Sequence, residues 1–311
     1  MYIYPTRGKL LGRKFVCFSV AVLLGSVPFS LPDAEQPHKA ATTQPPTGNP
    51  KTEHPANFEP AAADPLSGDW QGQGGYVAQV FPTSGGKYQA NLLTAFDTEN
   101  NVIAVLQGAP SGQGVIIFSG DDWHGVIQDG HFTARKGDKM LDVQRVSRPP
   151  PTLGARPPNG AVVLFAGRNL DHWAKKAGKN WLQEDGPARW KLVEGGAVEV
   201  VPGSDCIISH EKFGDCKLHL EFRTLGAPTN SGVYLQDRYE VNINETYGRI
   251  DLSPNAGFDN CSENAKPRIR PCRPLLEWQT FDIEFHAPRF DSRGNKIAKA
   301  RDRAFQRRDN L

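Results

Sequence analysis

The sequence predicts an all-β protein with two domains. Side chains alternate between apolar and polar with a period of two in the second half of the chain, which is typical of strands buried on one face. Glycine and proline are abundant, with 31 and 25 residues, and they separate many short alternating runs, as the turns of a β protein would. A chain of 311 residues has the length of about two domains.

The overall charge gives no reason to expect binding to nucleic acid. The chain has 36 Lys and Arg residues against 34 Asp and Glu residues, so its formal net charge is +2 at pH 7. A balance this close to neutral lacks the long-range attraction that strongly basic proteins exert on nucleic acids and anionic membranes. We therefore expect no nucleic-acid partner.

Residues 1–32 have the organisation of a secretory signal peptide. Four basic residues, Arg7, Lys9, Arg13 and Lys14, precede an apolar run at residues 15–27. That run is too short to span a bilayer comfortably, whereas the apolar region of a signal peptide has this length. We therefore expect removal of the segment, export to the periplasm or the extracellular space, and no membrane span afterwards. A membrane anchor left uncleaved is the alternative.

Four cysteines follow the expected signal peptide, and an even number in an oxidising compartment permits two disulfides. Three connectivities are possible, of which we favour Cys206 with Cys216 and Cys261 with Cys272. The first pair flanks an apparent hairpin turn at residues 211–214, and the second brackets one loop. A zinc site is the weaker alternative, because no pair of cysteines has the close spacing of a Cys-x-x-Cys motif.

Residues 33–147 predict a tether followed by a small β domain. Residues 33–63 are rich in Pro, Thr and Ala and have few large apolar side chains, so we expect a disordered linker. Residues 64–147 contain short strand-like runs with turn pairs at Gly85-Gly86 and Asp129-Gly130. These features predict an antiparallel meander or small barrel, to which the sequence assigns no chemistry.

A second, proline-rich linker at residues 148–159 leads into the domain at residues 160–311. Consecutive prolines hold this linker extended. Within the domain, residues 249–273 predict a long loop, a kind of segment that tends to be functional or disordered. The alternation stops after Lys296, so we expect no closing strands after that point and an exposed sheet edge.

Three strand-like segments of this domain carry chemistry-bearing side chains opposite their apolar ones. The apolar sets are Leu218, Leu220, Phe222, Tyr239, Val241, Ile243, Phe281, Ile283 and Phe285. The opposite sets are His219, Glu221, Arg223, Glu240, Asn242, Asn244, Asp282, Glu284 and His286. Neighbouring strands lie about 4.8 Å apart, so these side chains would converge if their strands are adjacent. Such a group suits proton transfer, a hard divalent cation or hydrogen bonding to sugar hydroxyls. The alternative is simple cross-strand pairing of charges.

The same segments resemble a known family. The motifs are Lys-Phe-Gly-Asp at 212–215, Leu-Glu-Phe-Arg at 220–223, Asn-Ser-Gly-Val-Tyr-Leu-Gln at 230–236, Arg-Tyr-Glu-Val at 238–241, Glu-Trp-Gln-Thr at 277–280 and Ala-Pro-Arg-Phe-Asp at 287–291. Together with Phe-Ala-Gly-Arg-Asn-Leu-Asp-His-Trp at 165–173, they resemble the 3-keto-disaccharide hydrolase family over residues 160–291.

The resemblance implies a concanavalin A-like jelly-roll sandwich and an enzyme that cleaves glycosides oxidised at C3. The ketone acidifies the proton on C2, so elimination of the C1 substituent followed by hydration would break the bond. A base, an enolate partner and hydroxyl-positioning groups are needed. We assign the base to Glu240 or His286, and the enolate partner to Arg223 or to a divalent metal held by Asp282. The groups in contact with the sugar substrate would be Asn230, Gln236, Tyr239, Glu221, Asn242 and Glu284.

Two other functions fit the same pattern. A non-catalytic, lectin-like module would depend on aromatic side chains that stack on sugar rings. Trp173, Trp181 and Trp190 are candidates, but tryptophan is more often a core residue, and we expect at least two of the three in the core. A hydrolase of unoxidised glycosides would use paired carboxylates. No cofactor other than the divalent metal is implied, and the sequence does not set the oligomeric state.

Overall fold

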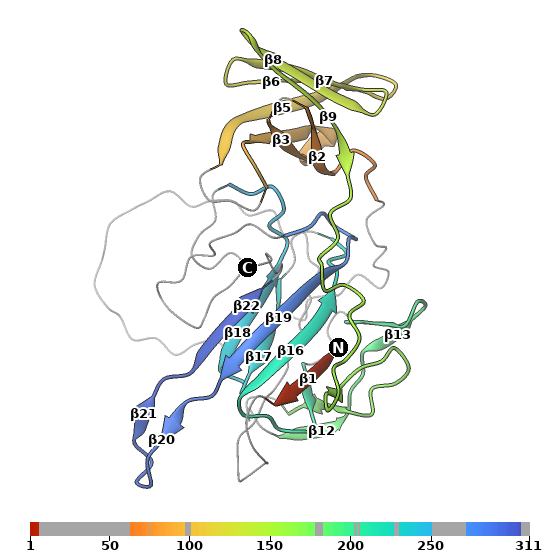
Figure 1. Ribbon diagram of the computed structural model, residues 1–311. Helices are drawn as coiled ribbons and strands as arrows, with labels where there is room; N and C mark the ends of the chain where they lie inside the picture. The colour runs from red at the N-terminus through yellow and green to blue at the C-terminus, as the bar shows by residue number, and fades with distance from the viewer. Residues whose placement is uncertain are drawn as a thin grey trace, which may run out of the picture.

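The computed structural model describes residues 1–5, 63–73, 75–96, 101–177, 183–201, 204, 206–226, 230–250 and 272–305. Nearly all regular structure in these ranges is β, so the predicted fold class is confirmed. A closed barrel lies at one end of the molecule and a sandwich at the other (Figure 1). Within the described ranges, no helix is long and apolar enough to cross a membrane.

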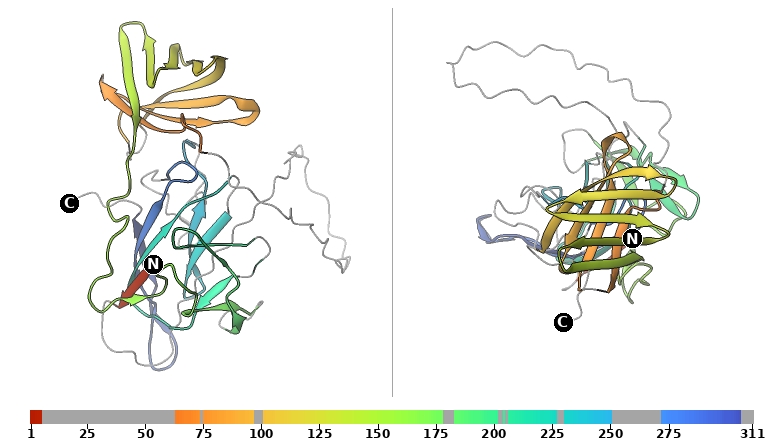
Figure 2. Two further views of the ribbon diagram at one scale, coloured as in Figure 1. Left: turned by 90° about the vertical axis from the view of Figure 1, so that its right-hand side faces the viewer. Right: turned by 90° about the horizontal axis from the view of Figure 1, so that it is seen from above.

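The first domain is an eight-stranded antiparallel barrel. Its strands are β2 (Gly68–Gln73), β3 (Val77–Pro82), β4 (Tyr88–Leu93), β5 (Val102–Gly112), β6 (Val115–Gly120), β7 (Trp123–Gln128), β8 (His131–Lys136) and β9 (Lys139–Val146). Each strand pairs with the next, and β9 returns to β2, so the barrel leaves no open edge (Figure 2). Trp70, Phe118 and Phe132 fill its interior, and all three are at most 1% exposed.

The turn chemistry of the barrel follows the sequence closely. Asp129 and Gly130 join β7 to β8, and both have the positive φ that a two-residue hairpin turn requires. Gly85 and Gly86 also have positive φ, but they lie inside a longer connection that contains the short 3-10 helix η1 (Ser84–Gly86). The small antiparallel domain is therefore confirmed, in its barrel form.

The second domain packs a five-stranded sheet against a hairpin. The sheet order is β10 (Val162–Val163), β1 (Tyr2–Pro5), β16 (Cys216–Phe222), β19 (Gln279–His286) and β22 (Arg301–Phe305). The hairpin is β17 (Asn230–Leu235) with β18 (Tyr239–Asn244). The predicted apolar sets of both layers, including Leu218, Val241 and Ile283, meet in one buried cluster. The sequence therefore predicts correctly which side chains of these strands face the core.

Smaller sheets complete this domain. One sheet contains β11 (Trp173–Lys176), β12 (Glu184–Pro187) and β15 (Ile207–Ser209). Two-stranded pairs are formed by β13 (Lys191–Val193) with β14 (Ala197–Glu199), and by β20 (Arg289–Phe290) with β21 (Lys296–Ala298).

Both ends of the described chain enter the five-stranded sheet, and the expectation of no strands after Lys296 is wrong. Residues 2–5 do not stand apart from the fold: β1 pairs with β16 on one side and with β10 on the other, and Ile3 is 0% exposed. At the other end, Arg301–Phe305 pairs with β19, although its sequence does not alternate. β22 is the last strand in the sheet order, so among the described residues the expected open edge of the sheet lies at β22.

The predicted disulfide between Cys206 and Cys216 is also absent. Cys206, Cys216 and Cys272 are free in the described part of the chain, and Cys261 lies outside it. Cys216 is 0% exposed in β16, where it belongs to the core cluster, whereas Cys206 precedes β15 in another sheet. Burial raises the pKa of the Cys216 and Cys272 thiols to about 12, which disfavours the reactive thiolate.

A buried polar group joins the two domains. The carboxylate of Asp69 in β2 accepts hydrogen bonds from Arg148 Nη1 at 2.8 Å, Arg273 Nη1 at 3.1 Å and Tyr247 Oη at 2.9 Å. Asp69 is 5% exposed and Arg273 is 6% exposed. Burial raises the pKa of the Tyr247 phenol and lowers that of the Arg273 guanidinium. The barrel is thus attached through side chains that water hardly reaches.

A second set of contacts supports this junction. Asn91 Nδ2 donates to the Gly248 carbonyl at 2.5 Å, and Arg145 Nη2 lies 3.0 Å from Glu277 Oε1. The rings of Phe81 and Tyr247 meet edge to face, with centroids 6.2 Å apart.

Candidate functional site

The predicted polar side chains do not form one face. The apolar sets of the five-stranded sheet and of the β17–β18 hairpin point toward each other, so their polar sets point outward on opposite sides of the sandwich. Asp282 and His286 in β19 therefore lie on one outer face, and Glu240 in β18 lies on the other. The expected convergence of these three residues is wrong because β16 and β19 are neighbours, while β18 belongs to the facing layer.

The outer face of the five-stranded sheet holds a nearly buried histidine. His219 is 3% exposed, and its Nδ1 lies 2.9 Å from Asp282 Oδ1, while its Nε2 lies 3.3 Å from Glu221 Oε1. Thr152 of the proline-rich linker donates to Asp282 Oδ2 at 2.6 Å. The ring of Tyr2 in β1 stacks on the imidazole, with centroids 4.8 Å apart. This part of the face is covered by protein.

The charge state of His219 follows from these partners. Burial alone would lower its pKa, but the hydrogen bonds and charges of Asp282 and Glu221 outweigh burial and raise the pKa above its ordinary value. His219 and Asp282 are cross-strand partners in β16 and β19, so this contact is of the cross-strand kind that the structural alternative describes.

His286 lies at an open edge of the same face. Its side chain is 48% exposed, with Nε2 3.6 Å from Glu284 Oε1 and Nδ1 3.8 Å from Asp215 Oδ2. Asp215 itself accepts hydrogen bonds from the Ala287 amide at 2.8 Å and from the Arg289 guanidinium. The hydrogen bond from Arg289 is the main reason that the pKa of Asp215 is lowered. His286 is thus part of a surface ion-pair network.

The outer face of the β17–β18 hairpin has a different character. Tyr234 and Glu240 are cross-strand partners, and the phenol is hydrogen bonded to the carboxylate. Desolvation, followed by this hydrogen bond, raises the pKa of Tyr234, so the phenol stays protonated as a donor. Gly232 lies beside them, and a Cβ at that position would collide with the Glu240 side chain. Asn242 is the cross-strand partner of Gly232.

Three other predicted contact residues take different places. Tyr239 points into the core, where its ring lies 5.7 Å from that of Phe285. Asn230 pairs with Asn244 at the start of β17. Gln236 lies in the turn of the hairpin, and both Gln236 and Asp237 have a positive φ that favours glycine. Tyr239 and Gln236 therefore do not line the outer face beside Glu240.

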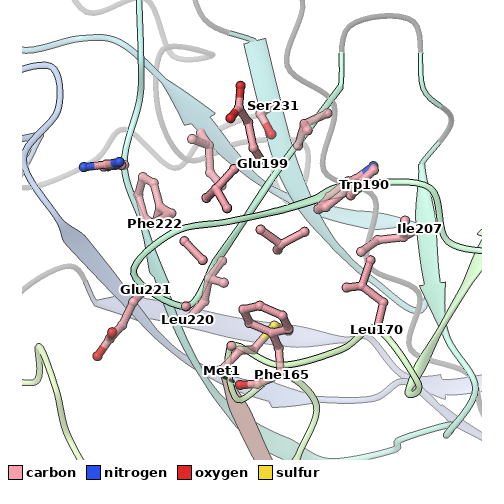
Figure 3. Close-up of a pocket in the computed structure, with 18 of the residues that line it drawn as sticks. Met1, Phe165, Leu170, Trp190, Glu199, Ile207, Leu220, Glu221, Phe222 and Ser231 are labelled. Carbon is pink, nitrogen blue, oxygen red and sulfur yellow. Dashed lines mark hydrogen bonds between the residues drawn. The ribbon is translucent and has the colours of Figure 1, made fainter. Parts of the chain in front are cut away.

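A cavity lies between the two layers. Its volume is about 390 Å³, and its lining is mainly apolar. Arg223 and Glu221, both predicted site residues, line it together with Trp278, whose ring lies 5.2 Å from Arg223 Cζ. Figure 3 shows Glu199 and Ser231 at one end of this cavity and Met1, Phe165 and Leu170 at the other.

Residues 160–303 match the family model of the 3-keto-alpha-glucoside-1,2-lyase-like domain. The resemblance found in the sequence is thereby confirmed for the second domain. Among solved structures, a crystal structure described as a "putative glycosyl hydrolase" from Parabacteroides distasonis is similar, with 23% identity and a TM-score of 0.34. The similarity covers 47% of this chain and 61% of that chain, and it is too distant to assign an activity. The comparison with curated proteins gave no match.

The matched span contains all of the predicted site residues. The barrel and strand β1 lie outside the matched span, although β1 occupies a position inside the five-stranded sheet of the domain. The interior of this sheet is therefore completed by residues that the family model does not cover.

A metal site is not apparent in the part of the chain that the structure describes. No group of three His, Cys, Asp or Glu side chains in these ranges is arranged to hold a metal ion. Both carboxylate oxygens of Asp282, the residue assigned to a metal, accept hydrogen bonds from His219 and Thr152. The described residues around Asp282 therefore do not fit a divalent cation.

Sequence reasoning missed Tyr234, Ser231 and Glu199. Tyr234 and Ser231 are both in the family motif at 230–236, and the alternation of β17 sends them to opposite faces of the hairpin. The polar partner of Glu240 could therefore have been found by aligning the two strands of the hairpin across its turn. Glu199 had no signal, because its strand β14 is only three residues long.

Proposed function

We propose that the lyase-like domain cleaves the glycosidic bond of glycosides oxidised at C3, and that Glu240 is the base that begins the reaction. The observation that carries this proposal is the pairing of Glu240 with the protonated phenol of Tyr234 on the outer face of the hairpin, where the absence of a side chain at Gly232 leaves the space that Glu240 occupies. A carboxylate beside a proton donor supplies the base and the enolate partner that removal of a proton next to a ketone requires.

The reaction would proceed in two stages. The Glu240 carboxylate takes the proton from C2, and the electron pair moves toward C3 to form an enolate. Collapse of the enolate forms a C1–C2 double bond and breaks the bond from C1 to the leaving oxygen, which takes up a proton. Water then adds at C1, and a proton returns to C2, so the 3-keto sugar is released.

Tyr234 and the amides have supporting roles in this scheme. The raised pKa of Tyr234 keeps its hydroxyl available to donate to the enolate oxygen or to the leaving oxygen. Asn242 and Asn244 follow Glu240 at the outward positions of β18, and we assign the binding of sugar hydroxyls to them. The family match supports cleavage of a glycoside, and the substrate oxidised at C3 is the finer part of the proposal.

His286 is the less favoured base. It lies on the opposite side of the sandwich from Glu240, in an ion-pair network with Glu284 and Asp215. We therefore place Asp282, Glu284 and Glu221 in the structural support of the sheet, and Glu240 in the chemistry.

The decisive experiment compares Glu240→Gln with His286→Ala on a 3-keto-disaccharide and on its unoxidised form. A positioned general base contributes about 10²–10⁴-fold, so Glu240→Gln should lower kcat by that order, whereas His286→Ala should keep activity. Reaction in deuterated water should place deuterium at C2 of the released 3-keto sugar. Turnover without label at C2 would instead support hydrolysis by water at C1. Binding without turnover in the wild type would support the lectin-like module.

We also propose that the chain is exported. The support for export is the basic segment before the apolar run at residues 15–27. Strand β1 precedes that run, so signal cleavage after it would release β1 together with the signal. N-terminal sequencing of the protein recovered from the periplasm and from the cytoplasm of an expressing cell tests both points. Recovery from the cytoplasm alone would contradict export.

A further inference from the structure

A second ligand site is suggested by the cavity between the two layers of the sandwich. The cavity lies on the inner side of the β17–β18 hairpin, whereas Glu240 and Tyr234 lie on its outer side. Its volume of about 390 Å³ is within the range of about 300–1,000 Å³ that small-molecule pockets occupy. The cavity is partly open at the surface, so a small molecule can enter it from solvent.

One buried hydroxyl in the cavity has no partner. Ser231 is 3% exposed, and its Oγ makes no hydrogen bond with any residue that the structure describes. A buried polar atom without a partner is costly, so such an atom usually marks an unrecorded water or ligand. Ser231 lines the cavity, and Figure 3 shows it near Glu199 at the same end.

The rest of the lining is mainly apolar and aromatic, and its other polar side chains are Glu221, Arg223 and Thr224. Phe165, Trp173, Trp190 and Phe222 line the cavity, and they offer flat surfaces to a ligand. A mainly apolar lining favours ligands with an apolar body. The polar end can pair with one hydroxyl group, which would donate to the Glu199 carboxylate and accept from Ser231 Oγ. Glu199 would repel a carboxylate at that end.

We propose that this cavity binds an uncharged, mainly apolar molecule that carries one hydroxyl group, with its apolar body between the two layers and its hydroxyl between Ser231 and Glu199. This site is separate from the sugar-cleaving face, and neither depends on the other.

Titration with 2-naphthol tests the proposal, because this compound has a flat apolar body and one hydroxyl. Naphthalene, which lacks the hydroxyl, and 2-naphthoate, which carries a charge, are the comparison probes. Isothermal titration calorimetry on the full chain should show binding of 2-naphthol at one site, with 2-naphthoate at least about tenfold weaker. Loss of one hydrogen bond is worth up to about tenfold in affinity, so Ser231→Ala should weaken 2-naphthol by about that factor and leave naphthalene unchanged.

Two further variants keep the result interpretable. Ala197→Leu adds bulk to the lining and should weaken every probe, whereas Ile117→Ala, on the exposed surface of the barrel, should change none. Glu240→Gln should bind 2-naphthol as the wild type does, which separates this site from the proposed activity. Absence of binding by all probes, or binding that Ser231→Ala and Ala197→Leu leave unchanged, would overturn the proposal.

Discussion

Replacement of Asp69 by alanine should strongly destabilise the protein. Asp69 lies in the barrel, and its carboxylate is the common acceptor for Arg148, Arg273 and Tyr247. Its side chain is 5% exposed, and that of Arg273 is 7% exposed. Removal of the carboxylate therefore leaves a guanidinium and a phenol buried without their acceptor.

The expected magnitude follows from that burial. Removing one partner from a buried ion pair costs about 3–5 kcal/mol, mostly because the remaining charge is left uncompensated. Exposed ion pairs are worth only about 0–1 kcal/mol. Asp142, whose side chain is 44% exposed and pairs with His131, is a matched control in the same barrel. Asp142→Ala should therefore lower the free energy of unfolding by no more than about 1 kcal/mol.

Urea unfolding, followed by tryptophan fluorescence and by circular dichroism, measures this difference. The wild type should show coincident transitions, because the junction couples the barrel to the sandwich. Asp69→Ala should lower the free energy of unfolding by about 3–5 kcal/mol and separate the two transitions. Asp69→Asn keeps the shape and tests the charge alone. If Asp69→Ala unfolds within about 1 kcal/mol of the wild type, the group is not buried as described and the reasoning is refuted.

Three other perturbations give sharp outcomes. Ile3→Ala should cost about 2–5 kcal/mol in urea unfolding because Ile3 is 0% exposed, whereas the exposed Ile297→Ala should cost nothing measurable; equal stability of both variants would mean that β1 is not part of the folded protein. His219 has a raised pKa, so its contribution is complete below the ordinary histidine pKa of about 6.5 and is lost as pH rises through the raised value. The melting temperature of the wild type should therefore fall relative to His219→Gln between pH 6 and pH 9, and a constant difference would contradict the assignment. Gly232→Ala should lower kcat/KM on a 3-keto-disaccharide by about tenfold or more, because the new Cβ displaces Glu240, while Gly214→Ala, which meets no atom within 4 Å, should have no effect.

The alternation of the sequence predicted which side chains are buried, but not which strands are neighbours. Leu218, Val241 and Ile283 are in the core as expected, because the pleat sends alternate side chains to opposite faces of any strand. The period says nothing about the layer to which a strand belongs. Glu240 and Asp282 were therefore placed together, although their strands face each other across the core.

Contacts between distant segments were beyond sequence reasoning for the same reason. Strands β1 and β16 are separated by more than 200 residues in the sequence, and no local pattern in Tyr2–Pro5 predicts that they pair. In the sequence, Asp69 is an ordinary polar residue near the start of a strand. Only its hydrogen bonds with four side chains in the folded protein show that it joins the two domains. The turn pair Asp129-Gly130 was predictable because its geometry depends on those two residues alone.

The β17–β18 hairpin is the element on which both proposals depend, and it is held at both of its ends. At the turn, Asp237 Oδ1 accepts a hydrogen bond from Lys176 Nζ of β11 at 2.8 Å, and the two side chains are 2% and 12% exposed. At the open end, Cys272 Sγ lies 3.7 Å from the Asn244 carbonyl. These two contacts hold the hairpin against the rest of the domain. They therefore help to orient both Glu240, which points outward, and Ser231, which points inward. Loosening the turn should therefore impair both the sugar-cleaving face and the cavity, whereas a substitution on one face of the hairpin should impair only that face.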